Sequence, residues 1–129
     1  MTDAPGFNAW HTDVAKSPAC ALIVQRALGL PPQVVSNSLL TGAGLAEVVA
    51  ALRLAPGQIL VDLACGRGGY GREVARRTGA RLVGLDFSAV AVTIAAHGGP
   101  RSRARFCVAT SAPPGCGTIA FTTAPSQAA

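Results

Sequence analysis

Hydrophobic residues between positions 57 and 108 form short continuous runs, which alternate with longer segments of helical spacing. Continuous apolar runs of about four to eight residues are typical of buried strands, and apolar residues three or four apart are typical of helices. The pattern predicts strand, helix, strand, helix and strand over Ile59–Leu63, Tyr70–Thr78, Arg81–Leu85, Ser88–His97 and Ala104–Val108. This order indicates an α/β fold with a parallel sheet of about three strands, right-handed crossovers and flanking helices.

The residues before this unit are patterned as helices. Ser17-Pro18 is a helix start, with serine as the capping residue and proline at the first helical position, and Gly29 is a stop. Apolar residues recur three and four positions apart over 45–52 and predict another helix. We therefore expect residues 1–55 to be an N-terminal helical cap segment, which covers the sheet or, alternatively, a ligand cleft.

The last stretch, residues 109–129, differs from the rest in composition. It contains no charged residue and three prolines, and it shows no apolar periodicity. Such a stretch is typical of irregular chain. We expect an irregular or disordered tail here, with at best an irregular strand around Thr118–Thr122.

Length and composition narrow the class of protein. The 129 residues suffice for one domain, and half of them are hydrophobic, which is enough for a core. Apolar runs such as Ala19–Val24 are far shorter than the roughly 20 residues of a membrane span. The N-terminus has acids and no secretory signal, so we expect a cytoplasmic protein with no membrane partner. The four cysteines form no CxxC motif and are read as reduced thiols, with no metal site: Cys20, Cys65, Cys107 and Cys116.

The chain has a net charge of +5, with ten arginines and one lysine. Five arginines fall around one predicted helix, but Tyr70 is the one aromatic residue among them that could stack on a base. None of the common nucleic-acid-binding motifs is present. We therefore expect no nucleic-acid partner.

Candidate chemistry gathers where the first two predicted strands end. Asp62 lies at the end of the first strand and Asp86 at the end of the second, with a glycine-rich loop over 64–71 between them. Ligands of open α/β sheets bind beyond the carboxyl ends of the strands, and a glycine loop lets the backbone approach them. Asp86 follows Gly66 by twenty residues, the spacing expected for a carboxylate that binds ribose hydroxyls. The sequence predicts an adenosine-containing ligand.

Asp62 distinguishes among such ligands. The loop also satisfies the dinucleotide fingerprint through Gly66, Gly68 and Gly71. A carboxylate four residues before the first of these glycines would repel a pyrophosphate. The same carboxylate suits a ligand that carries an ammonium and a sulfonium, such as S-adenosylmethionine. Alternatively, Asp62 caps loop amides and touches no ligand.

The segment Leu54–Val92 resembles the opening of a class I S-adenosylmethionine-dependent methyltransferase. The matching features are a Pro-Gly turn, a strand ending in an acid, a glycine loop, and a second strand ending in Asp-x-Ser. The resemblance implies a Rossmann-like fold, S-adenosyl-L-methionine as cofactor and a small-molecule methyl acceptor. It implies that the methionine portion contacts four residues, Asp62, Ala64, Gly66 and Gly68, while Asp86 holds the ribose hydroxyls and Phe87 lies against adenine. On this basis residues 56–108 are the cofactor-binding unit.

The chain departs from the family pattern at three places. The first loop position, usually glycine, is Ala64, and the acid common after the third strand is replaced by Ala109-Thr110-Ser111. The family's later strands are not recognisable after Val108, so we expect an incomplete sheet whose first strand keeps an unpaired edge. We interpret the ending as a truncated or frameshifted product, or as a natural short form completed by a partner chain.

Two further functions stay open at this point. One is an NAD(P)-binding oxidoreductase half-domain. The other is a non-catalytic relic that self-associates through its open strand edge. No catalytic residue can be named: His11 could face the cleft, whereas His97 ends a helix and Cys65 is read as a packing residue of the loop.

Overall fold

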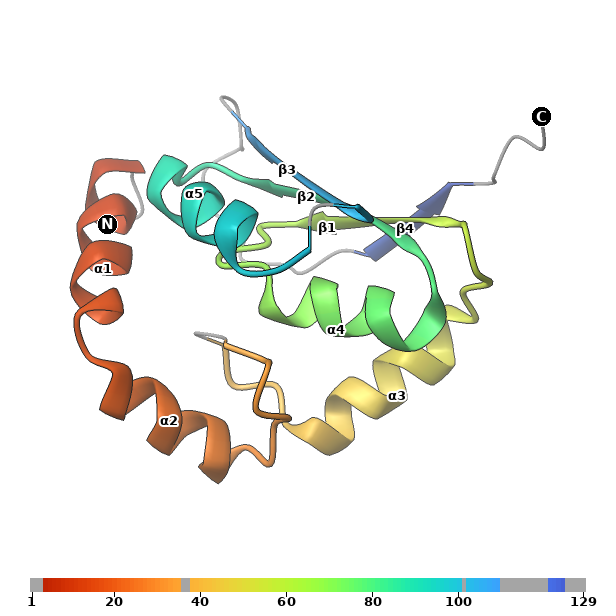
Figure 1. Ribbon diagram of the computed structural model, residues 1–129, viewed down its shortest axis with the longest axis horizontal. Helices are drawn as coiled ribbons and strands as arrows, with labels where there is room; N and C mark the ends of the chain where they lie inside the picture. The colour runs from red at the N-terminus through yellow and green to blue at the C-terminus, as the bar shows by residue number, and fades with distance from the viewer. Residues whose placement is uncertain (1–3, 36–37, 101, 110–120, 125–129) are drawn as a thin grey trace.

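The structure, a computed structural model, describes residues 4–35, 38–100, 102–109 and 121–124. Three parallel strands form one sheet: β1 (Ile59–Leu63), β2 (Arg81–Asp86) and β3 (Ala104–Val108). Helix α4 (Gly69–Thr78) connects β1 to β2, and α5 (Ala89–His97) connects β2 to β3 (Figure 1). The predicted Rossmann-like order of strands and helices is confirmed, and the ends of these elements agree to within one residue.

A fourth strand, β4 (Phe121–Ala124), pairs with β1 in the antiparallel direction and gives the sheet order β3-β2-β1-β4. The register places Ile59 opposite Ala124 and Asp62 opposite Phe121. The expectation of an unpaired β1 edge is therefore wrong. Unpaired backbone groups of an edge strand accept any extended segment, and the β-prone Phe-Thr-Thr stretch can supply one. The predicted strand around 118–122 overlaps β4 by two residues. Apart from Ala109 and β4, the predicted tail lies outside the described residues.

Local signals set most helix ends. Gly79 ends α4 with a φ of 76°, and its N–H donates to Ala75 O. Ser88 caps α5, because its Oγ accepts from Ala91 N at 3.1 Å. Ser17, expected to cap α2 (Pro18–Ala27), makes no side-chain capping bond. Its backbone instead turns directly out of α1 (Ala4–Ala15), and its ψ of 76° lies outside the extended geometry of a cap.

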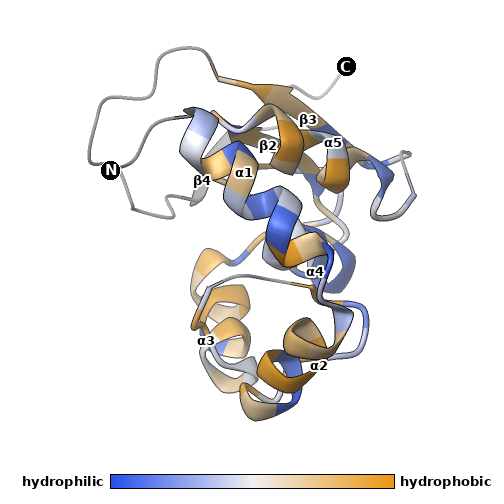
Figure 2. Ribbon diagram, turned by 90° about the vertical axis from the view of Figure 1, so that its left-hand side faces the viewer, coloured by the Kyte–Doolittle hydropathy of each residue, from blue (hydrophilic) through white to orange (hydrophobic). Residues whose placement is uncertain are grey.

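The N-terminal helices pack mainly on other helices. Helix α1 lies against α5, and α3 (Gly42–Leu52) lies against α4 (Figures 1 and 2). The expectation that they cover the sheet needs correction, because α4 and α5 contact the strands directly and the N-terminal segment joins that layer mainly through Leu45 of α3. Helix α2 contributes no buried residue and exposes three large apolar side chains, Leu22, Ile23 and Val24 (orange ribbon in Figure 2).

The core lies between the sheet and α4. Leu60 and Leu82 occupy equivalent positions on paired strands and are almost completely buried, together with Val74 of α4 and Leu45 of α3. Alternate strand positions point to this same layer, which is why Asp62 and Asp86 are buried as well. In the described part of the chain, no helix is long and apolar enough to cross a membrane.

Candidate functional site

A tight loop joins the carboxyl end of β1 to α4. Ala64, Gly66 and Gly68 have positive φ values of 59°, 53° and 75°. Two backbone hydrogen bonds hold the loop: Gly68 N donates to Cys65 O at 2.8 Å, and Cys65 N donates to Leu85 O of β2 at 2.9 Å. The left-handed conformation costs Ala64 roughly 1–2 kcal/mol, a cost that glycine would not carry. The hydrogen bonds of the loop therefore hold Ala64 in a left-handed conformation that its residue type disfavours.

Asp86 fastens this loop to the end of β2. Its Oδ2 accepts from Gly66 N at 2.7 Å, and its Oδ1 accepts from Ser88 N at 2.9 Å. The side chain is thus fixed by two backbone donors twenty residues and two residues away. Each carboxylate oxygen has about two acceptor sites, so one site on each remains for a ligand hydroxyl.

Asp62 is the second carboxyl group at this edge. It is 3% exposed, and no hydrogen bond to its carboxyl group is found among the described residues. Burial raises the pKa of Asp62 to about 7, and the neighbouring charge of Asp86 adds to the rise. Gly71 of α4 makes room for it, since a Cβ there would lie 2.5 Å from Asp62 Oδ2. A buried carboxyl group of this kind fits a cationic ligand group, which would supply the missing counter-charge.

A closely packed cluster lies beneath the loop. A Cβ at Gly68 would lie 2.7 Å from Phe106 Cε1, and a Cβ at Gly84 would lie 2.5 Å from Phe106 Cδ1 and 3.0 Å from Cys65 Sγ. Burial, with Asp62 and Asp86 nearby, raises the pKa of Cys65 to about 12. The thiol is therefore neutral, which supports packing rather than nucleophilic chemistry.

Helix α1 reaches this edge of the sheet, a contact that the sequence reasoning missed. Asn8 Oδ1 accepts from Ser88 Oγ at 2.7 Å and from Val90 N at 3.3 Å. The ring centroids of Phe7 and Phe87 are 4.9 Å apart, with the rings inclined at 64°. Asn8 lies far from its partners in sequence and has no local signature, so no pattern could have revealed these bonds.

The two histidines have different surroundings. His11 is 4% exposed, and its carbonyl accepts from Arg67 Nη2 of the glycine loop at 3.1 Å. Burial lowers the pKa of His11, and the Arg67 charge lowers it further. His97 is exposed, and its Nδ1 lies 2.7 Å from Thr93 O of the same helix, which confirms its place at the end of α5.

Two of the six predicted site residues meet directly, because Gly66 N donates to Asp86 Oδ2. Asp62 lies close enough to Asp86 for the Asp86 charge to raise the pKa of Asp62. Phe87 follows Asp86 and contacts Phe7. Ala64 is exposed on the loop. Gly68 instead faces Phe106 beneath the loop, so its contribution is close packing.

The fold and this edge together define a class: a Rossmann-like α/β unit with a glycine loop and two strand-end carboxyl groups at the carboxyl edge of its sheet, the edge where open α/β sheets bind ligands. No protein-family model matches the chain, and no curated protein matches it. Several solved structures, in contrast, are similar to the chain.

Three of these structures illustrate the similarity. YjhP from E. coli is 26% identical over 57% of this chain, with a TM-score of 0.51. A TehB-like SAM-dependent methyltransferase from Corynebacterium glutamicum is 21% identical over 78% of this chain, also with a TM-score of 0.51. A phosphoethanolamine N-methyltransferase from Haemonchus contortus, in complex with S-adenosyl-L-methionine, is 21% identical over 67%, with the same score.

These matches confirm the resemblance at the level of the fold. The chain shares its fold with part of two SAM-dependent methyltransferases. It spans 32% of the E. coli protein, 45% of the C. glutamicum protein and 20% of the H. contortus protein.

Proposed function

We propose that the chain binds S-adenosyl-L-methionine at the carboxyl edge of β1 and β2, as the cofactor-binding portion of a methyltransferase that acts on a small molecule. The observation that carries this proposal is the geometry of Asp86. Two backbone donors, Gly66 N and Ser88 N, fix its carboxylate while leaving an acceptor site on each oxygen. Two adjacent acceptors suit the two hydroxyls of a ribose.

Asp62 supports a sulfonium ligand over a dinucleotide. Its carboxyl group is buried without a counter-charge in the described part, so an ammonium or sulfonium would stabilise the ionised form. A pyrophosphate beside it would add a like charge. Ala64 and Gly66 would line the methionine portion from the loop, and Gly68 would keep the loop seated on the core.

Helix α1 would close the adenine end of the site. Phe87 would lie against the base, and Phe7 packs edge to face against the Phe87 ring. The Asn8 bonds to Ser88 and Val90 hold α1 in place. Such a cap helps to exclude water and to fix the orientation of reacting groups, which is the main protein contribution to a direct displacement. S-adenosylmethionine supplies the methyl group when bound, and we assign no acid or base to this chain.

The proposal extends to organisation and location. Residues 56–108 would be the cofactor-binding unit and residues 1–55 its cap, because Asn8 and Arg67 join the two parts next to the glycine loop. A cytoplasmic location agrees with the free thiols of Cys20, Cys65 and Cys107.

The test is calorimetric titration of the purified chain with S-adenosylhomocysteine and, separately, with NAD. We expect micromolar binding of S-adenosylhomocysteine only, weakened at least about tenfold by Asp86→Ala. Asp13→Ala is the matched control, because it removes an exposed carboxylate that contacts Lys16 alone among the described residues. Binding that survives Asp86→Ala, or preferential binding of NAD, would contradict the proposal.

A further inference from the structure

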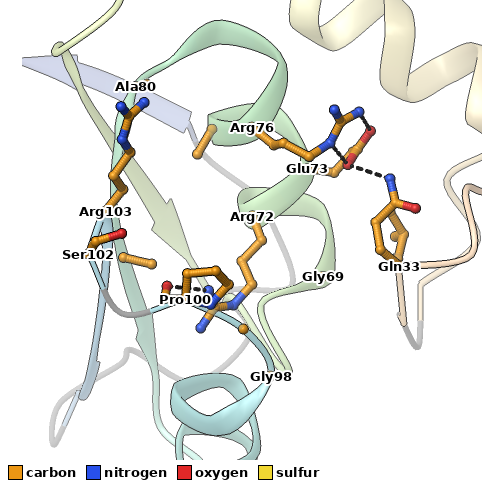
Figure 3. Close-up of a pocket in the computed structure, with 14 residues that line it drawn as sticks. Gln33, Gly69, Arg72, Glu73, Arg76, Ala80, Gly98, Pro100, Ser102 and Arg103 are labelled. Carbon is orange, nitrogen blue, oxygen red and sulfur yellow. Dashed lines mark hydrogen bonds and ion pairs between the residues drawn. The ribbon is translucent and has the colours of Figure 1, made fainter.

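A cavity of about 400 Å³ lies beside α4, away from the proposed cofactor site (Figure 3). Its walls are α4, residues 33–34, residues 98–100 and residues 102–104. None of the six residues proposed to bind the cofactor lines it. Its volume falls within the range of small-molecule sites, which is roughly 300–1,000 Å³.

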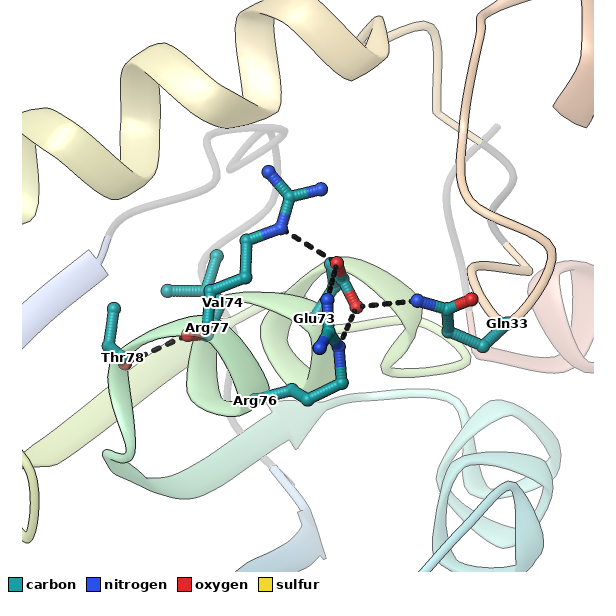
Figure 4. Close-up of polar contacts among 6 residues, drawn as sticks. All are labelled: Gln33, Glu73, Val74, Arg76, Arg77 and Thr78. Atoms are coloured by element: carbon teal, nitrogen blue, oxygen red, sulfur yellow. Dashed lines mark hydrogen bonds and ion pairs between the residues drawn. The ribbon is translucent and has the colours of Figure 1, made fainter.

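The single acid among the described lining residues, Glu73, is already neutralised. Its side chain is 1% exposed. Arg76 donates to both of its oxygens at 2.8 Å, Arg77 Nε donates at 2.7 Å, and Gln33 Nε2 donates at 3.2 Å (Figure 4). With two guanidinium groups on one carboxylate, this corner of the cavity offers no free negative charge.

The other two arginines of the lining have no acidic partner in the described part of the chain. Arg72 donates to two neutral carbonyls, Ala95 O at 2.7 Å and Pro100 O at 3.1 Å, and its Nε is buried without a partner among the described residues. Arg103, on the opposite wall in Figure 3, is exposed and forms no ion pair with any described residue. Arg72 also lies over the Phe106 ring, with its Cζ 4.9 Å from the ring centroid, so its partners are neutral groups. The lining thus carries two positive charges that no described acid neutralises, and that of Arg103 is the more accessible.

The rest of the lining is small and mostly apolar. Val34, Ala75, Ala80 and Ala104 supply apolar surface, while Ser102 adds a hydroxyl next to Arg103. An apolar wall with a few convergent polar groups is typical of a site for a small organic molecule. A guanidinium group can donate two parallel hydrogen bonds to the oxygens of a carboxylate or a phosphate.

We propose that this cavity binds a small organic oxyanion, a carboxylate or a phosphate carried on an apolar body. Arg103 and Ser102 hold the oxyanion, Arg72 contributes its charge from the inner wall, and the alanines contact the body. The site is independent of the cofactor site, since the two share no lining residue.

The test is titration of the full chain with benzoate and with phenyl phosphate, followed by calorimetry and by amide NMR shifts. We expect saturable binding of at least one probe, with shifts at Gly98 and Gly99. Arg103→Gln should weaken it about tenfold, because it removes a charge-assisted contact. Arg105→Gln is the matched control: it is exposed two residues further along β3 and does not line the cavity. It should change the affinity less than about twofold.

Equal weakening by both variants would overturn the proposal, because it would show attraction to net positive charge rather than a site. Absence of saturable binding, or shifts that map to the glycine loop instead of Gly98 and Gly99, would overturn it as well. The NMR shifts are read on the unsubstituted chain, so they decide the matter even if Arg103→Gln fails to fold. Affinity for S-adenosylhomocysteine should be unchanged in Arg103→Gln, and failure of either proposal is thus seen separately.

Discussion

Replacing Asp62 with asparagine should stabilise the ligand-free protein at neutral pH while weakening ligand binding. Burial raises the folded-state pKa from 3.8 to about 7. The folded state therefore binds more protons than the unfolded state between these values, and stability falls as pH rises through this window and levels off above it. A shift of about three units corresponds to an upper value of about 4 kcal/mol, at 1.36 kcal/mol per unit. Asparagine has nearly the same shape beside Gly71 and does not ionise.

The assay is urea unfolding of both proteins from about pH 4 to about pH 8, which spans the titration. The unsubstituted chain should lose stability across this range, whereas Asp62→Asn should lose little. Above pH 7, Asp62→Asn should therefore be more stable than the unsubstituted chain, by at most about 4 kcal/mol. Asp13→Asn, an exposed control, should follow the unsubstituted chain. Parallel curves for Asp62→Asn and the unsubstituted chain would refute the reasoning. In calorimetry Asp62→Asn should bind S-adenosylhomocysteine more weakly, and unchanged affinity would remove Asp62 from the site.

Two further substitutions and one labelling reaction test the ion pairs and the packing around the sheet. Hydrogen bonds from two arginines hold the pKa of Glu73 at about 2. The contribution of Glu73 to the free energy of unfolding is therefore fully present above about pH 4.5 and is lost as the pH falls through 2. Glu73→Gln should therefore cost about 2 kcal/mol at pH 7 in urea unfolding, and a loss that persists undiminished near pH 2 would contradict this. Gly84→Ala should cost about 1–3 kcal/mol by pushing against Phe106, and a neutral change in thermal unfolding would show that the layer has room. A maleimide should label exposed Cys20 much faster than Cys65, and equal rates in the folded protein would disprove the neutral thiol.

The parallel strands were predictable because their signals are local. Ile59–Leu63 and Ala104–Val108 appear in the structure with the predicted bounds, and Ser88 caps α5 as its residue type indicates. Strand β4 was only partly anticipated, because four residues of weak pattern become a strand through pairing with β1. Register with a distant strand decides such a segment, and no window of the sequence contains that information.

In the candidate site too, contacts set by the order of strands were predictable and contacts with distant segments were not. The contact of Asp86 with Gly66 was predictable, since the end of β2 and the loop after β1 meet wherever two parallel strands are neighbours. The contact of α1 with the start of α5 was not predictable, because Asn8 bonds to Ser88 across eighty residues and no local sequence motif indicates that bond. That Arg72 and Arg103 lack acidic partners among the described residues was equally hidden, since the sequence shows only that the chain contains many arginines.

Helix α4 shows how a single element can serve both proposed sites. Its start faces the cofactor edge, where Gly71 leaves room for Asp62, and its next residue, Arg72, turns toward the cavity and the carbonyls of Ala95 and Pro100. Successive helical positions point about 100° apart, so neighbours in sequence reach different surfaces. The glycine is required by the buried carboxyl group and the arginine by the helix–loop contact. The two requirements are therefore met by adjacent residues without competing, which is why a substitution at one surface should leave ligand affinity at the other unchanged.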